Sequence, residues 1–214
     1  MQQYTKIAVI GGTGKAGKYL VNKLIERGFH LKLLLRNPET FSIQNPLIEI
    51  IKGNVNDYDT VLSLVADCQA VISALGLGQP ASEKSIFSKA TNNILRAMQV
   101  YGIQRYIVMT GINVNTLFDK KSPKTQFATD WMHTNYPIST ADRQKEYDIL
   151  LSSNIDWTLV RLPLIEQTDE VGNILIGLED CVGDKISATN LANFLIDQLT
   201  DNQYVKQSPF ISNV

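Results

Sequence analysis

Seven residues near the start of the chain have the composition and spacing of a loop that holds a phosphate. The segment Gly11-Gly12-Thr13-Gly14-Lys15-Ala16-Gly17 fits Gly-x-Gly-x-x-Gly from Gly12 and Gly-x-x-Gly-x-x-Gly from Gly11. An apolar run precedes it, and apolar residues at spacings of three and four follow it. A glycine turn between a strand and a helix lets the backbone approach a pyrophosphate, and the helix N-terminus attracts the anion. The segment therefore predicts a site for a nicotinamide dinucleotide.

The second apolar run ends in a cation, which bears on the choice of dinucleotide. The sequence Leu33-Leu34-Leu35-Arg36-Asn37 has Arg36 where NAD-binding sheets usually place an acid that accepts from the ribose. A guanidinium binds phosphate with two hydrogen bonds, whereas an acid would repel it. Lys15 adds a second positive charge within the glycine loop. We therefore expect NADP(H) to be preferred over NAD(H).

A second group of residues could form a pocket for the molecule that is reduced. Trp131, Met132, His133 and Tyr136 are aromatic or polarizable and follow the fifth apolar run. They could form the wall of a flat substrate, with His133 as a proton donor. Alternatively, Trp131 and Tyr136 anchor an irregular segment to the core, as buried aromatic residues usually do. Arg161 lies in a strand before Pro163, which favours a structural hydrogen-bonding role over a catalytic one.

The elements that position these residues alternate between strands and helices. Predicted strands cover residues 6–10, 31–35, 48–51, 70–75, 105–110 and 157–161, with short strands near 174–176, 184–186 and 209–211. Predicted helices cover residues 15–27, 57–65, 82–101, 142–152 and 188–199, and residues 111–129 are expected to be irregular. Strands that are apolar on both faces and alternate with helices predict an α/β fold. We expect a Rossmann-type doubly wound parallel sheet with helices on both faces and a small C-terminal extension, in one domain over residues 1–214.

Bulk composition excludes several other classes. The 214 residues are 44% hydrophobic and 19% charged, with a formal net charge of −1 and no basic run, so a nucleic-acid partner is not expected. No apolar run approaches the roughly 20 residues of a membrane span, and the N-terminus lacks the pattern of a signal peptide. We therefore expect a cytoplasmic protein with no membrane partner. Cys68 and Cys181 form no metal or disulfide motif, so buried free thiols and no bound metal are expected.

Several ordered motifs together resemble a known family. They are Gly11–Gly17, Leu35-Arg36-Asn37, Gly53-Asn54-Val55, Ala70–Gly76, Asp156–Pro163 and Ile186–Ala192. This set resembles the NmrA-like branch of the atypical short-chain dehydrogenase/reductases, with a layout similar to that of the biliverdin reductase B type of flavin reductase.

The resemblance implies a role for each cofactor-binding residue. Gly11, Thr13, Gly14 and Gly17 would hold the pyrophosphate, with Lys15 and Ala16 in the same loop. Arg36 would hold the 2′-phosphate, and Asn54 and Val55 would face the adenine. Ala74, Leu75 and Gly76 would line the nicotinamide ribose, and Thr110 would border the nicotinamide pocket.

The sequence also departs from the family pattern. Asn54 stands where the family usually has aspartate, and no Tyr-x-x-x-Lys occurs after the fifth strand, although Arg143 lies near the expected lysine. Carbonyl and epimerase chemistry need a proton donor at the developing alkoxide, so the missing pair disfavours them. Hydride transfer to a flavin or quinone is less demanding because the conjugated ring spreads the incoming charge and solvent can supply the proton.

Three functions follow in decreasing order of preference. The first is an NADPH-dependent oxidoreductase acting on a flavin-like or quinone-like planar acceptor, with Thr110, His133 and Tyr136 as candidate catalytic residues. The second is a redox sensor of the NmrA type that binds NADP(H) without catalysis and reports to a protein partner. The third is a nucleotide-sugar epimerase or dehydratase, which the short chain disfavours because such enzymes carry a large C-terminal substrate domain. The sequence leaves the oligomeric state open.

Overall fold

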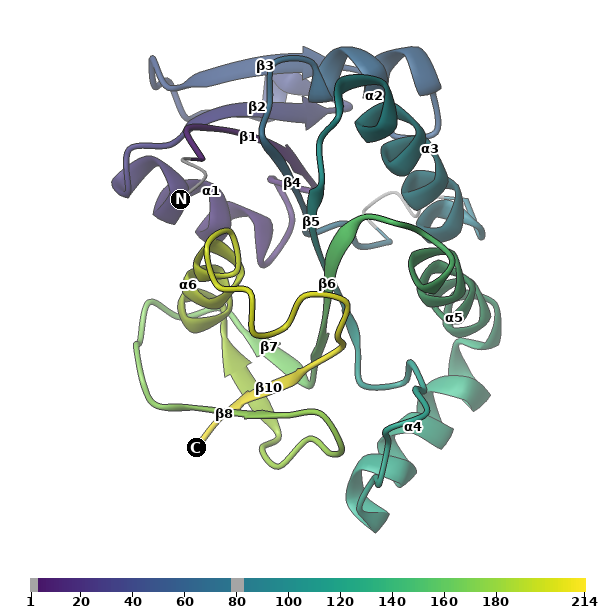
Figure 1. Ribbon diagram of the computed structural model, residues 1–214. Coiled ribbons are helices and arrows are strands. Elements are labelled where there is room, and N and C mark those ends of the chain that lie inside the picture. Colours follow the sequence, from purple (N-terminus) through teal and green to yellow (C-terminus); the bar gives the residue numbers. More distant parts are fainter. Residues whose placement is uncertain (1–3, 78–82) are drawn as a thin grey trace.

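An eight-stranded sheet forms the centre of the computed structural model, which describes residues 4–77 and 83–214 (Figure 1). The strands are β1 (Lys6–Ile10), β2 (His30–Leu35), β3 (Ile48–Lys52), β4 (Ala70–Ser73), β5 (Arg105–Gly111), β6 (Asp156–Leu162), β7 (Leu164–Glu166), β8 (Ile174–Gly177), β9 (Lys185–Ser187) and β10 (Phe210–Asn213). The sheet order is β3-β2-β1-β4-β5-β6-β10-β8, and β7 pairs with β9 separately. Among the described strands of this sheet, only β8, which pairs with β10, runs antiparallel to its neighbour. The first six strands therefore have the Rossmann order, with the switch between β1 and β4.

Helices cover both faces of this sheet. They are α1 (Gly17–Glu26), α2 (Tyr58–Val65), α3 (Ile86–Tyr101), α4 (Pro123–Asn135), α5 (Pro137–Leu151) and α6 (Ala188–Asp197), with a 3₁₀ turn at Pro38–Thr40. Side chains of α2, α3 and α5 pack in one hydrophobic cluster, and those of α1 and α6 pack in the other. Figure 1 shows the same division, with α1 and α6 on one side and α2, α3 and α5 on the other. The predicted doubly wound α/β fold is confirmed.

Strand β1 shows why the fold takes this form. Ala8 and Ile10 belong to the cluster with α2, α3 and α5, whereas Ile7 and Val9 belong to the cluster with α1 and α6. All four side chains are buried. A strand that is apolar on both faces can be buried only in a sheet covered on both sides.

The structure corrects several predicted boundaries. Helix α1 begins at Gly17 rather than at residue 15, and α3 begins at Ile86 rather than at residue 82, which lies outside the described residues. The prediction that residues 111–129 are irregular was wrong from residue 123 on, since α4 begins at Pro123, whereas residues 112–122 are irregular as predicted. The backbone N–H of Thr125 donates to the side chain of Ser122, and a proline occupies the first turn. This Ser-Pro pair is a helix-start signal that the apolar spacing did not reveal.

The C-terminal extension enlarges the sheet and braces it against α1. Strands β10 and β8 add to the sheet beyond β6, and the short strand β7 was not predicted. Arg27 at the end of α1 donates to Asp197 at 2.6 Å and to Asn193 at 2.9 Å, both on α6. Among the described residues, no helix has the length and apolar character needed to cross a membrane.

Candidate functional site

The glycine loop lies at the carboxyl edge of the parallel strands and is shaped by close backbone contacts. Gly11 follows β1 with a φ of 77°, and a Cβ there would lie 2.5 Å from the carbonyl oxygen of Ala74. A Cβ on Gly17 would overlap the carbonyl oxygen of Gly11. Both positions therefore require glycine, and they bring the loop between the end of β4 and the first turn of α1. Gly17 therefore allows the close approach of the helix to the loop.

The N-terminus of α1 follows this loop directly and has no side-chain cap among the described residues. The N–H of Gly14 donates to Gly11 O at 3.0 Å, which closes the turn. Ala16 occupies the N-cap position of the helix. Thr13, Gly14 and Lys15 are exposed, whereas Ala16 is buried. Helix N–H groups without side-chain acceptors favour an anion, so the cradle fits the pyrophosphate of a dinucleotide.

The ends of β2 and β3 lie next to the loop on the side predicted to hold adenosine. Arg36 follows β2 directly and is exposed. The Asn54 carboxamide oxygen accepts from the N–H of Asn56 at 3.0 Å, so this acceptor already stabilises a turn. The Val55 side chain is buried in the core, and its carbonyl accepts from Asn93 Nδ2 at 3.0 Å. An adenine contact from Val55 would therefore use backbone rather than side chain.

The ends of β4 and β5 form the side predicted to hold the nicotinamide. Ala74 is buried and donates its N–H to Ile10 O at 2.9 Å, whereas Gly76 is exposed. Thr110 is 4% exposed, and its hydroxyl oxygen has no hydrogen-bond partner among the described residues. A buried hydroxyl without a partner is costly unless a bound group satisfies it. Thr110 thus lies buried near the end of β5, and its place beside a nicotinamide stays a prediction.

Arg143 occupies the place expected of the family lysine, but its guanidinium is bonded to the backbone. It donates through Nη2 to Leu75 O at 2.7 Å and through Nη1 to Met109 O at 3.1 Å. Four residues earlier on α5, where the missing motif would place tyrosine, the chain has Ser139. Arg143 therefore reaches the carboxyl ends of β4 and β5 without a tyrosine one turn before it.

The aromatic residues predicted as an acceptor wall lie at the junction of α4 and α5. Trp131 is 48% exposed, Tyr136 is 47% exposed, and their rings meet edge to face with centroids 5.7 Å apart. Figure 1 shows α4 extending beyond the end of α5, away from the sheet. The alternative that these aromatics anchor the segment to the core was wrong, because the buried residues of α4 are Thr125 and Thr129.

His133 is the remaining predicted catalytic residue of this segment. Its side chain is exposed and lies in the last turn of α4. This exposed position gives no support to a catalytic role for His133, which stays a prediction.

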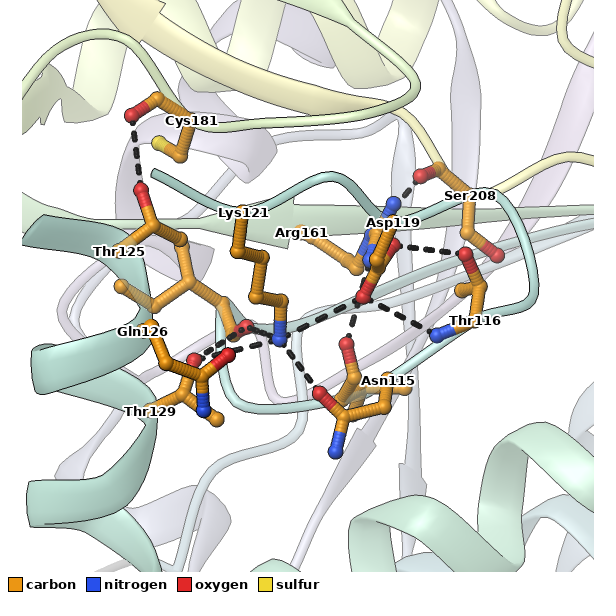
Figure 2. Close-up of polar contacts among 12 residues, drawn as sticks. Asn115, Thr116, Asp119, Lys121, Thr125, Gln126, Thr129, Arg161, Cys181 and Ser208 are labelled. Atoms are coloured by element: carbon orange, nitrogen blue, oxygen red, sulfur yellow. Dashed lines mark hydrogen bonds and ion pairs between the residues drawn. The ribbon is translucent and has the colours of Figure 1, made fainter. Parts of the chain in front are cut away.

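A cluster of Arg161, Asp119 and Lys121, whose contacts were not predicted from the sequence, holds the segment after β5 (Figure 2). Arg161 donates to Asp119 at 2.6 Å and to the carbonyls of Ser208, Val114 and Leu178, which confirms its predicted structural role. Lys121 Nζ donates to Ile112 O, Asn115 Oδ1 and Thr129 Oγ1 at 2.9, 2.6 and 3.2 Å. Burial lowers the pKa of Lys121, and Asp119 opposes that shift. The cluster fastens the approach to α4, and only spatial proximity could have revealed it.

A separate cavity of about 720 Å³ lies in the C-terminal extension. Its lining mixes charged, polar and apolar residues, and comprises Lys124, Glu166, Thr168, Glu170, Val171, Gly172, Val182, Gly183, Asp184, Lys185, Ser187, Asn213 and Val214. None of the residues predicted to contact the dinucleotide lines it. Two ion pairs, Lys185 with Glu166 and Lys124 with Asp184, cross this region at 3.1 and 2.6 Å.

The two thiols are buried, as predicted. Cys68 and Cys181 are free, and burial raises the pKa of each to about 11. Both are therefore protonated near neutral pH and lack the thiolate needed of a nucleophile.

Fold and loop together define a Rossmann-type dinucleotide-binding protein, and a family comparison agrees. The model of a family described as NAD(P)H-binding matches residues 11–202. This match covers most of the chain, from the glycine loop to beyond α6. The chain belongs to this NAD(P)H-binding family.

Individual relatives are more distant. An uncharacterized chloroplastic protein of Arabidopsis thaliana is 25% identical over 210 residues, with 92% of this chain and 73% of the relative covered. The chloroplastic protein TIC 62 of Pisum sativum is 25% identical over 221 residues, with 88% of this chain but only 39% of the relative covered. The chain thus spans well under half of that longer protein. The predicted cytoplasmic location stays a prediction.

A solved structure shows the same fold. A short-chain dehydrogenase/reductase from Veillonella parvula in complex with NADP has a TM-score of 0.81 and 18% identity, with 99% of this chain and 95% of that chain covered. The fold is therefore that of short-chain dehydrogenase/reductase-like proteins. The finer resemblance to biliverdin reductase B stays a prediction.

Proposed function

We propose that this protein is an NADPH-dependent reductase that transfers hydride to a flat conjugated acceptor, a flavin or a quinone. The type of reaction is inferred from the surroundings of Arg143. This cation donates to two strand-end carbonyls, and Ser139 precedes it where a catalytic tyrosine is expected. Reduction of a carbonyl needs an acid at the oxygen, whereas a conjugated ring can accept hydride first and a solvent proton later.

The residues of the chain would bind and orient the two reactants. Gly11, Gly14 and the N-terminus of α1 would hold the pyrophosphate, and Thr110 would offer its buried hydroxyl beside the nicotinamide. When bound, the dinucleotide supplies the hydride. The contribution of the protein is then proximity and orientation, which account for much of the barrier lowering in such reactions.

Charge supports NADPH as the dinucleotide. Arg36 at the end of β2 and Lys15 in the glycine loop are both exposed cations beside the predicted adenosine end. A 2′-phosphate would gain charge-assisted hydrogen bonds from them. Direct titration with NADPH and NADH tests this preference, and tighter binding of NADH would contradict it.

The acceptor class is tested by NADPH oxidation with FMN, riboflavin and a set of quinones under anaerobic conditions. We expect saturable turnover above the rate of the same mixture without protein for at least one acceptor. A carbonyl substrate set measured in parallel is the matched control, and we expect no turnover there. Turnover of carbonyls alone would overturn the proposed acceptor class.

A redox sensor is the second candidate, favoured by the exposed apolar residues near α4. Leu117, Phe118 and Phe127 are 99%, 70% and 72% exposed. Exposed apolar groups gathered in one segment often meet a protein partner. A partner that binds with equal affinity in NADP⁺ and in NADPH would exclude this function.

A further inference from the structure

Arg143 connects two strand ends at the predicted nicotinamide side. Strands β4 and β5 are adjacent, and their register pairs Ser73 with Val108. Leu75 and Met109 lie just beyond that pair toward the carboxyl edge, and both of their carbonyls accept from Arg143. One guanidinium on α5 therefore spans the ends of two neighbouring strands.

The guanidinium is held in one orientation by buried neighbours. Its Nη1 donates to Glu146 Oε2 at 2.7 Å, and Glu146 Oε1 accepts from Thr91 Oγ1 at 2.9 Å. The Arg143 Cζ atom lies 3.3 Å from the centroid of the Phe87 ring. The Arg143 and Glu146 side chains are 11% and 3% exposed. A buried planar fork bonded on several sides has little freedom to rotate, so it fixes the carbonyls it contacts.

We infer that Arg143 is a positioning residue that fixes the segment after β4 for the nicotinamide half of the dinucleotide. The inference rests on the proposed NADPH site and on the expectation, from the family resemblance, that residues 74–76 line the nicotinamide ribose. Arg143 acts on that segment through the carbonyl of Leu75. The adenosine half lies on the other side, at the glycine loop and Arg36, and is independent of this contact.

Two ligands separate these halves experimentally. NADPH would occupy both halves of the site. Adenosine 2′,5′-bisphosphate, which contains the adenosine and its 2′-phosphate but no nicotinamide, would occupy only the adenosine half. We expect Arg143→Met to weaken NADPH binding by about tenfold or more, the scale of one lost charge-assisted contact, with the bisphosphate affinity within about twofold. A role limited to overall stability would move both affinities together or neither.

Two further variants keep the test decisive if the single substitution unfolds the protein by leaving Glu146 unpaired. The double variant Arg143→Met with Glu146→Gln removes both charges of the pair. Arg143→Lys keeps the charge beside Glu146 but lacks a planar fork that reaches two carbonyls. We expect both to weaken NADPH and to spare the bisphosphate.

Arg105 provides a matched control at the opposite end of β5. Its guanidinium also donates to backbone carbonyls, those of Gln198 and Asp156, each at 2.8 Å. Arg105→Met is expected to lower thermal stability and to leave the ratio of the two affinities unchanged.

The outcomes distinguish the inference from the proposed function. If the unmodified protein binds neither ligand, the proposed NADPH site falls and the inference falls with it. If the unmodified protein binds both and the Arg143 variants change the two affinities equally, the inference alone is overturned. A selective loss of NADPH affinity in the folded Arg143 variants, absent in Arg105→Met, supports it.

Discussion

The glycine loop and helix α4 both carry residues whose types suggest chemistry, but their constructions differ. At the loop, Gly11 and Gly17 are pressed against backbone atoms and leave no room for a side chain. On α4, the buried residues are Thr125 and Thr129, whereas Phe127 and Trp131 are 72% and 48% exposed. The cofactor half of the site is therefore preorganised by the backbone, whereas the aromatics proposed for the acceptor half are not held by the core. Substitutions in the glycine loop should therefore affect ligand binding more strongly than substitutions on α4.

The largest expected effect is that of Gly11→Ala. The positive φ and the contact with Ala74 O are both unfavourable for a Cβ, which together cost about 2–3 kcal/mol and distort the cradle. We expect NADPH affinity to fall by about 100-fold, as measured by titration calorimetry.

Gly28→Ala is the matched control for that change. Gly28 has nearly the same φ, 79°, but a Cβ there would have no atom within 4 Å, and it lies at the opposite end of α1. Gly28→Ala is expected to lower stability by about 1 kcal/mol with unchanged NADPH affinity. Equal loss of affinity in the two variants would contradict a local role for the loop.

Alkaline pH tests whether the α4 region is packed as firmly as the central core. Cys68 lies in the core cluster with α2, and the carbonyl of Cys181 accepts from Thr125 of α4 at 3.2 Å. Burial raises the pKa of each thiol from 9.0 to about 11, so the folded chain keeps protons that the unfolded chain releases. The free energy of unfolding should therefore fall as pH rises from about 9 to about 11, by about 2 kcal/mol per thiol.

Chemical denaturation across this pH range measures the effect. Cys68→Ala and Cys181→Ala should each show a smaller alkaline loss than the unmodified protein. If only Cys68→Ala does so, the region around α4 opens to solvent more readily than the core.

Arg36→Ala sharpens the comparison at the adenosine end. A guanidinium that binds the 2′-phosphate contributes to NADPH but not to NADH, so NADPH affinity should fall by about tenfold with NADH affinity nearly unchanged. Arg27→Ala, at the far end of α1 in an exposed ion pair with Asp197, is the control and should change neither affinity. An equal loss of NADH affinity would show that Arg36 does not act through the 2′-phosphate.

The smallest effect is expected at Trp131. Because its ring is half exposed and contacts Tyr136 at the edge, Trp131→Ala should change the free energy of unfolding by less than about 1 kcal/mol. Trp157→Ala is the matched control in the core, where the ring is 2% exposed, and should cost about 3–5 kcal/mol. Similar losses in the two variants would show that α4 is anchored after all.

How far the sequence predicts the structure depends on the range of the interactions involved. The strands of the central sheet and the glycine loop follow from local apolar runs and glycine spacing, so their prediction was accurate. Helix α4 was missed because it lacks an apolar face toward the core, and the Ser122-Pro123 start signal carried the information instead. The contact of Arg143 with Leu75 joins segments that are far apart in the sequence. The contact of Lys121 with Ile112 lies within irregular backbone. Neither composition nor periodicity encodes such contacts.

The proposed reaction moves hydride from a dinucleotide bound at this edge to a flat acceptor. Single-turnover oxidation of NADPH deuterated on one or the other face of nicotinamide C4, with FMN or a quinone under anaerobic conditions, tests it most directly. A bound nicotinamide presents one face, so deuterium on only one face should slow the reaction. Tight NADPH binding with no oxidation above the protein-free rate, or equal slowing by both labels, would overturn the proposed hydride transfer.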